Sequence, residues 1–183
     1  NELYVTNNPV NIGNPSLEPE TIRTYEIGLR YKYTKRISTN INYFFNVIRD
    51  EIIVGATNTS GATPIYENKG GSNIQGIEFE SKAVLSNNWP NAYLFANYTY
   101  QDAESRGDPL PDVPKHKGNI GVNAGLTEFF NVNLRTFVSD ERIRAEEDNR
   151  SDSPGYAIMN LTLIAKDFFN SMKLKASVFN LLD

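Results

Sequence analysis

The chain has 183 residues and a formal net charge of -4, and its sequence pI of about 5.1 argues against nucleic acid as a partner. It contains no cysteine, which excludes a disulfide scaffold, a thiol nucleophile and a cysteine-ligated metal site. Mean hydropathy is -0.46 and no run approaches the roughly 18 apolar residues of a membrane-spanning helix, whereas a transmembrane β-barrel requires apolar residues only at alternate strand positions.

Apolar and polar residues alternate with a period of two in about eight segments, which is the pattern of strands in a sheet that is apolar on one face. In the first segment Tyr25, Ile27 and Leu29 share the apolar face, while Glu26 and Arg30 share the polar face. We expect the strands, in chain order, near residues 21–32, 37–48, 72–84, 92–101, 117–125, 131–138, 156–165 and 172–180.

Two of these segments depart from strict alternation. The fourth places Tyr93 and Phe95 on its polar face, and the seventh does the same with Ile158 and Ile164. The pattern therefore predicts these two strands less clearly than the other six.

The connections between the segments alternate in length. Long polar connections follow the second, fourth and sixth segments, at 49–71, 102–116 and 139–155, and residues 1–20 resemble the end of another. Short turns fall at 33–36, 85–91, 126–130 and 166–171. In an antiparallel sheet this order places every short turn at one end, as in outer-membrane barrels with short periplasmic turns and long extracellular loops.

Aromatic residues gather at both strand ends, as the interface girdles of a membrane barrel do. The set beside the short turns is Tyr31, Tyr33, Trp89, Phe129, Phe130, Phe168 and Phe169. The set near the long connections is Tyr43, Phe45, Tyr66, Tyr98, Tyr100 and Tyr156.

A soluble β-sandwich that binds carbohydrate or protein through its loops explains the alternation equally well, but explains the unequal connections and the two aromatic sets less well. The two architectures differ in what covers the apolar face, because a barrel turns it to lipid and a sandwich packs it against a second sheet. The residues that distinguish them are Tyr25, Ile27, Leu29, Ile41, Tyr43, Leu134 and Leu174.

Few residues suggest chemistry. His116 is the single histidine, so neither a histidine-dependent triad nor a multi-histidine metal site can be built, and we expect a polar residue at a strand start. The run Glu146–Asp148 could bind a divalent cation but lacks the spacing of a calcium loop, so a solvated loop is the better interpretation. Gly70 and Gly71 indicate a turn rather than a phosphate loop.

Four local motifs resemble those of the TonB-dependent outer-membrane receptor family. They are Asn14–Glu20 followed by Tyr25–Leu29, Tyr66–Asn68 with Gly76–Glu80, Pro111–His116, and Val178–Asp183. The motifs come in the family's order and span nearly the whole chain. One departure is Leu182, where the family usually has an aromatic residue.

The resemblance implies an all-β, antiparallel up-and-down transmembrane β-barrel segment, with about eight strands of a barrel of about 22 at residues 21–180 and an extracellular loop end at residues 1–20. It implies a receptor for TonB-energised uptake of a scarce ligand such as a ferric siderophore or cobalamin. Outer-membrane lipid, an N-terminal plug domain and TonB acting through that plug are the implied partners. The plug, the final strand and any export signal are expected outside these residues.

On this interpretation no bond is made or broken, so we expect no enzyme activity, catalytic residue, cofactor or metal site. A passive porin-type channel remains an alternative from a third class. Candidate ligand contacts in the extracellular loops are Tyr66, Arg106, Asp108, Asp140, Arg142 and Arg144. Candidates facing the lumen or the plug are Glu26, Arg30, Glu78, Glu80, Lys173 and Lys175.

Overall fold

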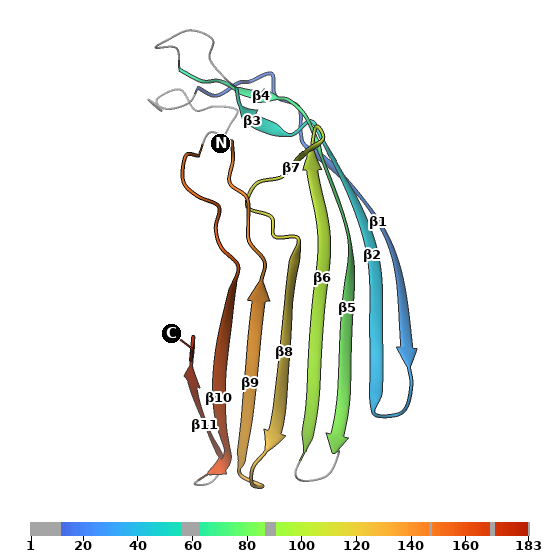
Figure 1. Cartoon of the computed structure of the whole chain (residues 1–183), viewed down its shortest axis with the longest axis vertical. Coiled ribbons are helices and arrows are strands. Elements are labelled where there is room, and N and C mark those ends of the chain that lie inside the picture. Colours follow the sequence, from blue (N-terminus) through green and yellow to red (C-terminus); the bar gives the residue numbers. More distant parts are fainter. Residues whose placement is uncertain (1–11, 56–62, 87–90, 147, 169–170, 183) are drawn as a thin grey trace. The chain divides into compact units, whose positions relative to one another are not determined.

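The structure is a computed structural model, and it describes residues 12–55, 63–86, 91–146, 148–168 and 171–182 (Figure 1). Its strands are β1 (Thr21–Lys32), β2 (Ile37–Arg49), β3 (Ile52–Val54), β4 (Tyr66–Asn68), β5 (Ser72–Ser86), β6 (Ala92–Ser105), β7 (Asp108–Pro109), β8 (His116–Gly125), β9 (Phe130–Ser139), β10 (Tyr156–Phe168) and β11 (Met172–Val178). In the part of the chain that is described, no helix is long and apolar enough to span a membrane.

All eight expected strands are confirmed, with ends that shift by a few residues, and they form one sheet in the order β1-β2-β5-β6-β8-β9-β10-β11. Within the described residues β1 and β11 are the edges of this sheet, which does not close on itself. The remaining strands were not expected. They lie inside the long connections, where β3 pairs with β4 and β7 pairs with β6.

The chain divides into two compact units. The smaller comprises residues 1–25, 45–75 and 103–110, and it contains the β3–β4 hairpin, β7 and the neighbouring strand ends. The larger comprises residues 26–44, 76–102 and 111–183, and it contains most of each long strand.

In the larger unit the register keeps residues of one kind on one face across neighbouring strands. Leu94 lies opposite Val122, Val122 opposite Leu134, and Leu134 opposite Leu161. Leu161 in turn lies opposite Val178 of β11. Because side chains alternate along a strand, this row defines an apolar face, and the residues between its members form a polar face.

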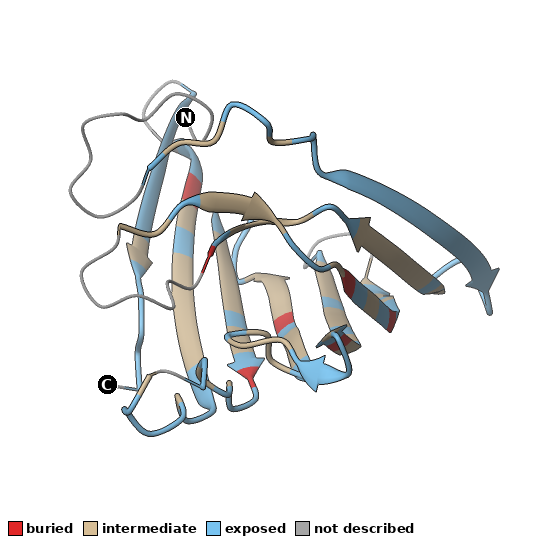
Figure 2. Ribbon diagram, turned by 90° about the horizontal axis from the view of Figure 1, so that it is seen from above, coloured by how far each residue is buried: buried red, intermediate tan, exposed pale blue. Residues whose placement is uncertain are grey.

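The apolar face is not buried. Ile27 is 71% exposed and Leu174 62%, and the buried hydrophobic residues of the described chain are Ala103 and Ala165 alone. Figure 2 shows buried positions only as scattered short bands, most of them on the strands. A sandwich would bury this face against a second sheet, so the exposure favours the barrel interpretation and disfavours the sandwich.

Most described members of the aromatic sets are exposed, for example Tyr33 at 65% and Phe130 at 47% beside short turns, and Tyr98 at 44% near a long loop, whereas Phe45 and Tyr66 are half-buried. Two members of the second set do not lie on the apolar face of the main sheet: Tyr66 is in β4, and the ring of Tyr156 lies 5.8 Å from that of Phe137 on the polar face. Trp89 and Phe169 lie outside the described residues.

The aromatic residues that interrupt the alternation of β6 have partners on the polar face. The Lys82 ammonium lies 4.3 Å from the centre of the Tyr93 ring. The Phe95 ring covers Gly121, where an added Cβ would meet the ring and would also approach the Leu134 carbonyl oxygen to 2.7 Å. A glycine opposite an aromatic ring therefore explains why an apolar side chain occupies a polar-face position.

Candidate functional site

The long connection between β2 and β5 is joined to the segment that precedes β1, within the smaller unit. The Asn68 amide nitrogen donates to the carbonyls of Asp50 at 2.7 Å and Glu18 at 2.8 Å, and its oxygen accepts from the Glu18 amide at 2.7 Å. The Glu20 carboxylate accepts from the Ile52 amide at 2.7 Å. These bonds join the β3–β4 pair to the segment that precedes β1, so the two form one hydrogen-bonded loop structure.

Tyr66 contributes to the same loop structure through its backbone. Its amide donates to the Ile12 carbonyl at 3.2 Å, and its carbonyl accepts from the Asn14 side chain at 2.9 Å. The residue is half-buried and lies opposite Val54 in the β3–β4 pair. Its backbone therefore has a structural role.

Arg106 lies over Gly70 in the smaller unit. Gly70 has a φ of 103°, and an added Cβ there would approach Nη2 of Arg106 to 2.9 Å. Ser105 donates from its hydroxyl to the Gly71 carbonyl at 3.3 Å. The two glycines thus form a turn before β5, as expected, and they let Arg106 lie against that turn. Arg106 and Asp108 are both exposed.

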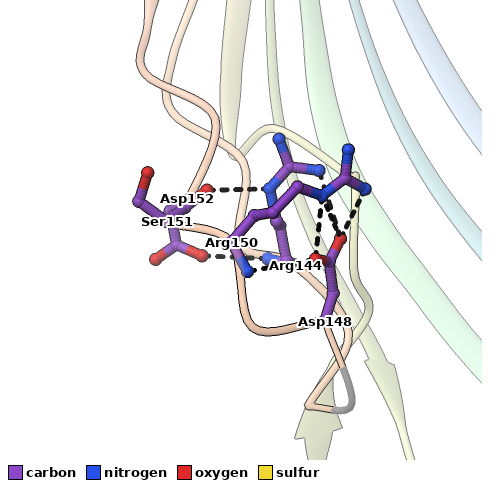
Figure 3. A network of polar contacts seen from close by, with 5 residues as sticks. All are labelled: Arg144, Asp148, Arg150, Ser151 and Asp152. Carbon is purple, nitrogen blue, oxygen red and sulfur yellow. Dashed lines mark hydrogen bonds and ion pairs between the residues drawn. The ribbon is translucent and has the colours of Figure 1, made fainter.

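The connection between β9 and β10, in the larger unit, is a hairpin closed by charged residues (Figure 3). Arg142 and Ser153 exchange two backbone hydrogen bonds of 2.9 Å. Beyond this pair the Arg144 guanidinium donates to the Ser151 carbonyl at 2.7 Å and contacts the Asp148 carboxylate at 3.3 Å, and the Arg150 guanidinium contacts the same carboxylate at 2.7 Å. We call Arg144, Asp148 and Arg150 the arginine clasp.

Hydrogen bonding from the Arg150 side chain and backbone, together with attraction from Arg144, lowers the pKa of Asp148 to about 2. The Asp148 side chain also raises the pKa of Arg150, to which Asp112 adds a smaller attraction. The Asp112 amide donates to the Ile143 carbonyl at 2.8 Å, so the connection between β7 and β8 is tied to the hairpin.

The predicted residues of this hairpin have different surroundings. Arg144 forms an ion pair with Asp148 inside the loop, and this pair is the alternative to a contact with the ligand. Arg142 is half-buried, and within the described residues its Nε has no hydrogen-bond partner. Asp140 is exposed, and its carboxylate accepts a hydrogen bond from the Glu141 backbone amide at 2.9 Å.

Sequence reasoning missed Arg150, although an aspartate two residues before an arginine in a long loop is a usable signal. The cation interpretation of the acidic run gains no support, because Asp148 is engaged by arginines and Glu147 lies outside the described residues. Among the described side chains there is no group of three histidine or acidic residues that could hold a metal ion.

His116 begins β8, as expected. Its Nδ1 and the Tyr98 hydroxyl share a hydrogen bond of 2.6 Å, and its ring lies 5.2 Å from that of Tyr100. The histidine therefore belongs to an aromatic group at the end of the strands that bears the long loops.

On the polar face the structure joins two of the predicted charged residues through an amide. The Arg30 Nε donates to Asn40 at 2.9 Å, and Asn40 donates to the Glu80 carboxylate at 3.2 Å. A hollow of about 350 Å³ lies over β2, β5 and β6, and Glu80 and Lys82 are among its lining residues. The other predicted members of this face are exposed: Glu26, Glu78, Lys173 and Lys175.

Residues 1–181 match the family model described as TonB dependent receptor-like, beta-barrel. A curated relative is the iron-regulated outer membrane virulence protein of Vibrio cholerae, 27% identical over 190 residues that cover 93% of this chain. The chain spans 28% of that relative.

Solved structures share the fold at low sequence identity. The siderophore receptor PirA from Acinetobacter baumannii superposes with a TM-score of 0.74 at 20% identity, covering 94% of this chain and 29% of the receptor. The copper transporter OprC superposes with a TM-score of 0.73 at 18% identity, covering 94% of this chain and 28% of the transporter.

Proposed function

Because this chain belongs to the TonB-dependent receptor-like β-barrel family, we propose that it supplies barrel wall and extracellular loops to an outer-membrane receptor that takes up a scarce ligand with energy from TonB. The observation that carries the proposal is the two-faced sheet, in which Ile27, Leu29 and Leu174 are exposed on one side and a polar face lies on the other. Exposed apolar rows on a sheet of this size are stable when lipid covers them. The chain is thus part of an outer-membrane β-barrel.

The ligand we propose is a ferric siderophore, with cobalamin or another scarce metal chelate as the alternative. The names of the relatives support this class, since they include an iron-regulated outer-membrane protein, a siderophore receptor and a copper transporter. The extracellular loops supply the contacts. In the smaller unit these are Tyr66, Arg106 and Asp108, and in the larger unit Asp140 and Arg142, while Arg144 pairs with Asp148 inside its own loop.

The polar face supplies the second part of the proposal, contact with a plug domain through Glu26, Arg30, Glu78, Glu80, Lys173 and Lys175. Glu80 is the best supported of these residues. The nearest cation on the same strand, Lys82, lies over the Tyr93 ring. Glu80 accepts a hydrogen bond from the neutral Asn40 amide, and its charge is therefore available to a cation of the plug. If Glu78→Lys and Glu80→Lys leave both plug retention and uptake unchanged, these two residues do not dock the plug.

The family consists of transport receptors rather than enzymes, and we propose that this chain has no catalytic residues and needs no cofactor. A soluble sandwich is disfavoured by the exposed apolar face, and a passive porin by the family match.

The test uses the full-length parent protein. Cells are fractionated, and the outer-membrane fraction is run on an SDS gel with and without boiling. A band that migrates faster unboiled is expected of a closed barrel. Growth and uptake are then measured in cells with and without TonB, with ferric enterobactin, ferric citrate, ferric yersiniabactin and cobalamin supplied one at a time. Uptake that does not require TonB would refute the proposed function.

A further inference from the structure

The polar face of the larger unit changes in character across the sheet. Over β1 and β5, on either side of the neutral polar face of β2, it carries charged side chains of both signs. We call this region the charged wall, and its members are Glu26, Arg30, Glu78, Glu80 and Lys82.

Over β6, β8, β9 and β10 the same face is mostly neutral, and three consecutive rows follow from the register. They are Asn97, Asn119, Phe137 and Ile158; then Phe95, Gly121, Arg135 and Asn160; then Tyr93, Asn123, Asn133 and Thr162. We call these rows the amide wall. Arg135 is their charged member.

Side-chain hydrogen bonds run across the amide wall. The Arg135 Nε donates to Asn119 at 2.7 Å, and Asn119 donates to Asn97 at 3.0 Å. Arg135 and the two amides therefore form one chain of side-chain hydrogen bonds across β9, β8 and β6. Nearby, Thr162 shares a bond of 3.1 Å with Ser177 of β11, and beyond Ser177 the same face of that strand carries Lys175 and Lys173.

The boundary between the two walls is also built from specific contacts. Lys82 of β5 lies over the Tyr93 ring of β6, which holds the last cation of the charged wall against an aromatic face. One row further, Gly121 lets the Phe95 ring lie close to the sheet. A side chain at position 121 would push that ring away from the sheet, so the glycine keeps the surface of the amide wall flat at this row.

The two walls suit different tasks. Fixed charges bind oppositely charged groups strongly when water is partly excluded, and such contacts part slowly. An amide offers both a donor and an acceptor, carries no net charge, and exchanges its partners with water at little net cost. A polar, charged solute is therefore retained by a charged wall and can slide along an amide wall.

We propose that the amide wall is the sector of the lumen along which a hydrated, charged metal chelate passes, while the charged wall holds the plug in place. This assignment rests on the proposed receptor function and adds the route of transit. The solute is recognised by hydrogen bonds in passing, with Arg135 as the one fixed cation that it meets in these rows.

The experiment introduces single cysteines into the full-length receptor, with any cysteines elsewhere in the parent replaced. This segment has none of its own, so each thiol reports alone. Asn119→Cys and Asn133→Cys lie on the amide wall. Asn42→Cys lies on the polar face of β2, between the charged-wall strands β1 and β5, and replaces the same residue type. Ile120→Cys, beside Asn119 but on the apolar face, controls for exposure through the lipid side.

Iron-starved cells are supplied with the member of the chelate panel that supports their growth, and are treated with fluorescein maleimide, which does not cross membranes. Labelling is compared with and without TonB. We expect Asn119→Cys and Asn133→Cys to react several-fold faster when TonB is present. Asn42→Cys should not change, and Ile120→Cys should stay unreactive in both strains.

Equal TonB-dependent labelling of Asn42→Cys and Asn119→Cys, or a response at Asn42→Cys alone, would overturn the assignment of the transit sector. So would the same labelling at all positions in both strains when growth still requires TonB. Growth that does not require TonB is a separate result, because it refutes the receptor function itself.

Discussion

Asp148 shows how a single carboxylate can organise a long loop. It accepts hydrogen bonds from Arg144 and Arg150, and the Arg150 bonds are the main reason that its pKa falls from 3.8 to about 2. Isolated surface ion pairs contribute little to the free energy of unfolding. The role of this cluster is therefore geometric, because one carboxylate holds two arginines of the same turn together.

The first prediction concerns the pH dependence of this arginine clasp. The pKa of Asp148 is lower in the folded loop than in the unfolded chain. The stabilisation of the loop by ionised Asp148 is therefore fully present above about pH 4 and is lost as the pH falls through about 2. We therefore expect hydrogen exchange of the Arg144 and Arg150 amides, corrected for intrinsic rates, to be constant from about pH 7 to pH 5. Asp148→Asn should speed exchange at both amides throughout that range. Glu146→Gln, an exposed neighbour, is the control; equal acceleration by both variants would contradict the clasp.

The second prediction concerns Gly121. An alanine there would press its Cβ against the Phe95 ring and the Leu134 carbonyl, and overpacking of this kind costs about 1–3 kcal/mol. Gly121→Ala should lower the thermal midpoint of the purified full-length barrel, measured as loss of the fast-migrating unboiled band. The control is Gly28→Ala, because a Cβ at Gly28 would meet its nearest atom at 3.4 Å. Phe95→Ala should not fully rescue Gly121→Ala, since the backbone oxygen remains; full rescue would show that the ring is the only obstacle.

At the level of the strand, alternation predicted most of the fold. It located all eight long strands, because a sheet that is apolar on one face imposes a period of two over many residues. It could not locate β3, β4 and β7, which have two or three residues each and contain no period. Those strands depend on long-range bonds such as that from Asn68 to Glu18, which pairs residues 50 positions apart.

For the polar-face candidates too, the sequence predicted the face of the sheet but not the hydrogen-bond partners. Parity placed Arg30 and Glu80 on the correct face, but it gave no sign that Asn40 joins them. Hydrogen-bond partners depend on the stagger between strands, which the alternation within each strand does not contain. The apolar residues Tyr93 and Phe95 appeared as imperfections for the same reason, since the residues that they contact lie on neighbouring strands.

The third prediction compares the two faces of one strand. Leu134 lies near the middle of β9 in the apolar row, and Asn133 beside it lies on the amide wall. Leu134→Arg should destabilise the barrel by about 2–4 kcal/mol if it faces the bilayer midplane. Asn133→Arg should cost much less, because the lumen face is hydrated. Unfolding of the full-length protein in lipid vesicles measures both; equal losses would mean that β9 does not separate lipid from lumen.

At the scale of the whole molecule, the residues that the structure describes form a sheet with two edges and almost no buried apolar core. Its stability therefore depends on what covers the apolar face and on what pairs with β1 and β11. Unpaired backbone groups in lipid cost several kcal/mol each, and an open edge is a template for further strands. This follows from the sheet order and applies to the 183-residue segment when it is produced by itself.

The last prediction is that the isolated segment self-associates through these edges. Produced alone and refolded without detergent, it should elute from a sizing column as a broad distribution of assemblies, with light scattering well above the mass of one chain. Pairing requires free backbone amides at the edge, so a proline that removes one of them is the appropriate variant. Successive amides of an edge strand point to opposite sides, so one of the two variants Ile27→Pro and Gly28→Pro in β1 removes a free edge amide and should shift the distribution toward smaller assemblies. Ile120→Pro in β8, an interior strand, should disrupt folding instead. A sharp monomer peak without detergent would mean that the edges of β1 and β11 find partners within one chain, and the sheet would then have to curl onto itself.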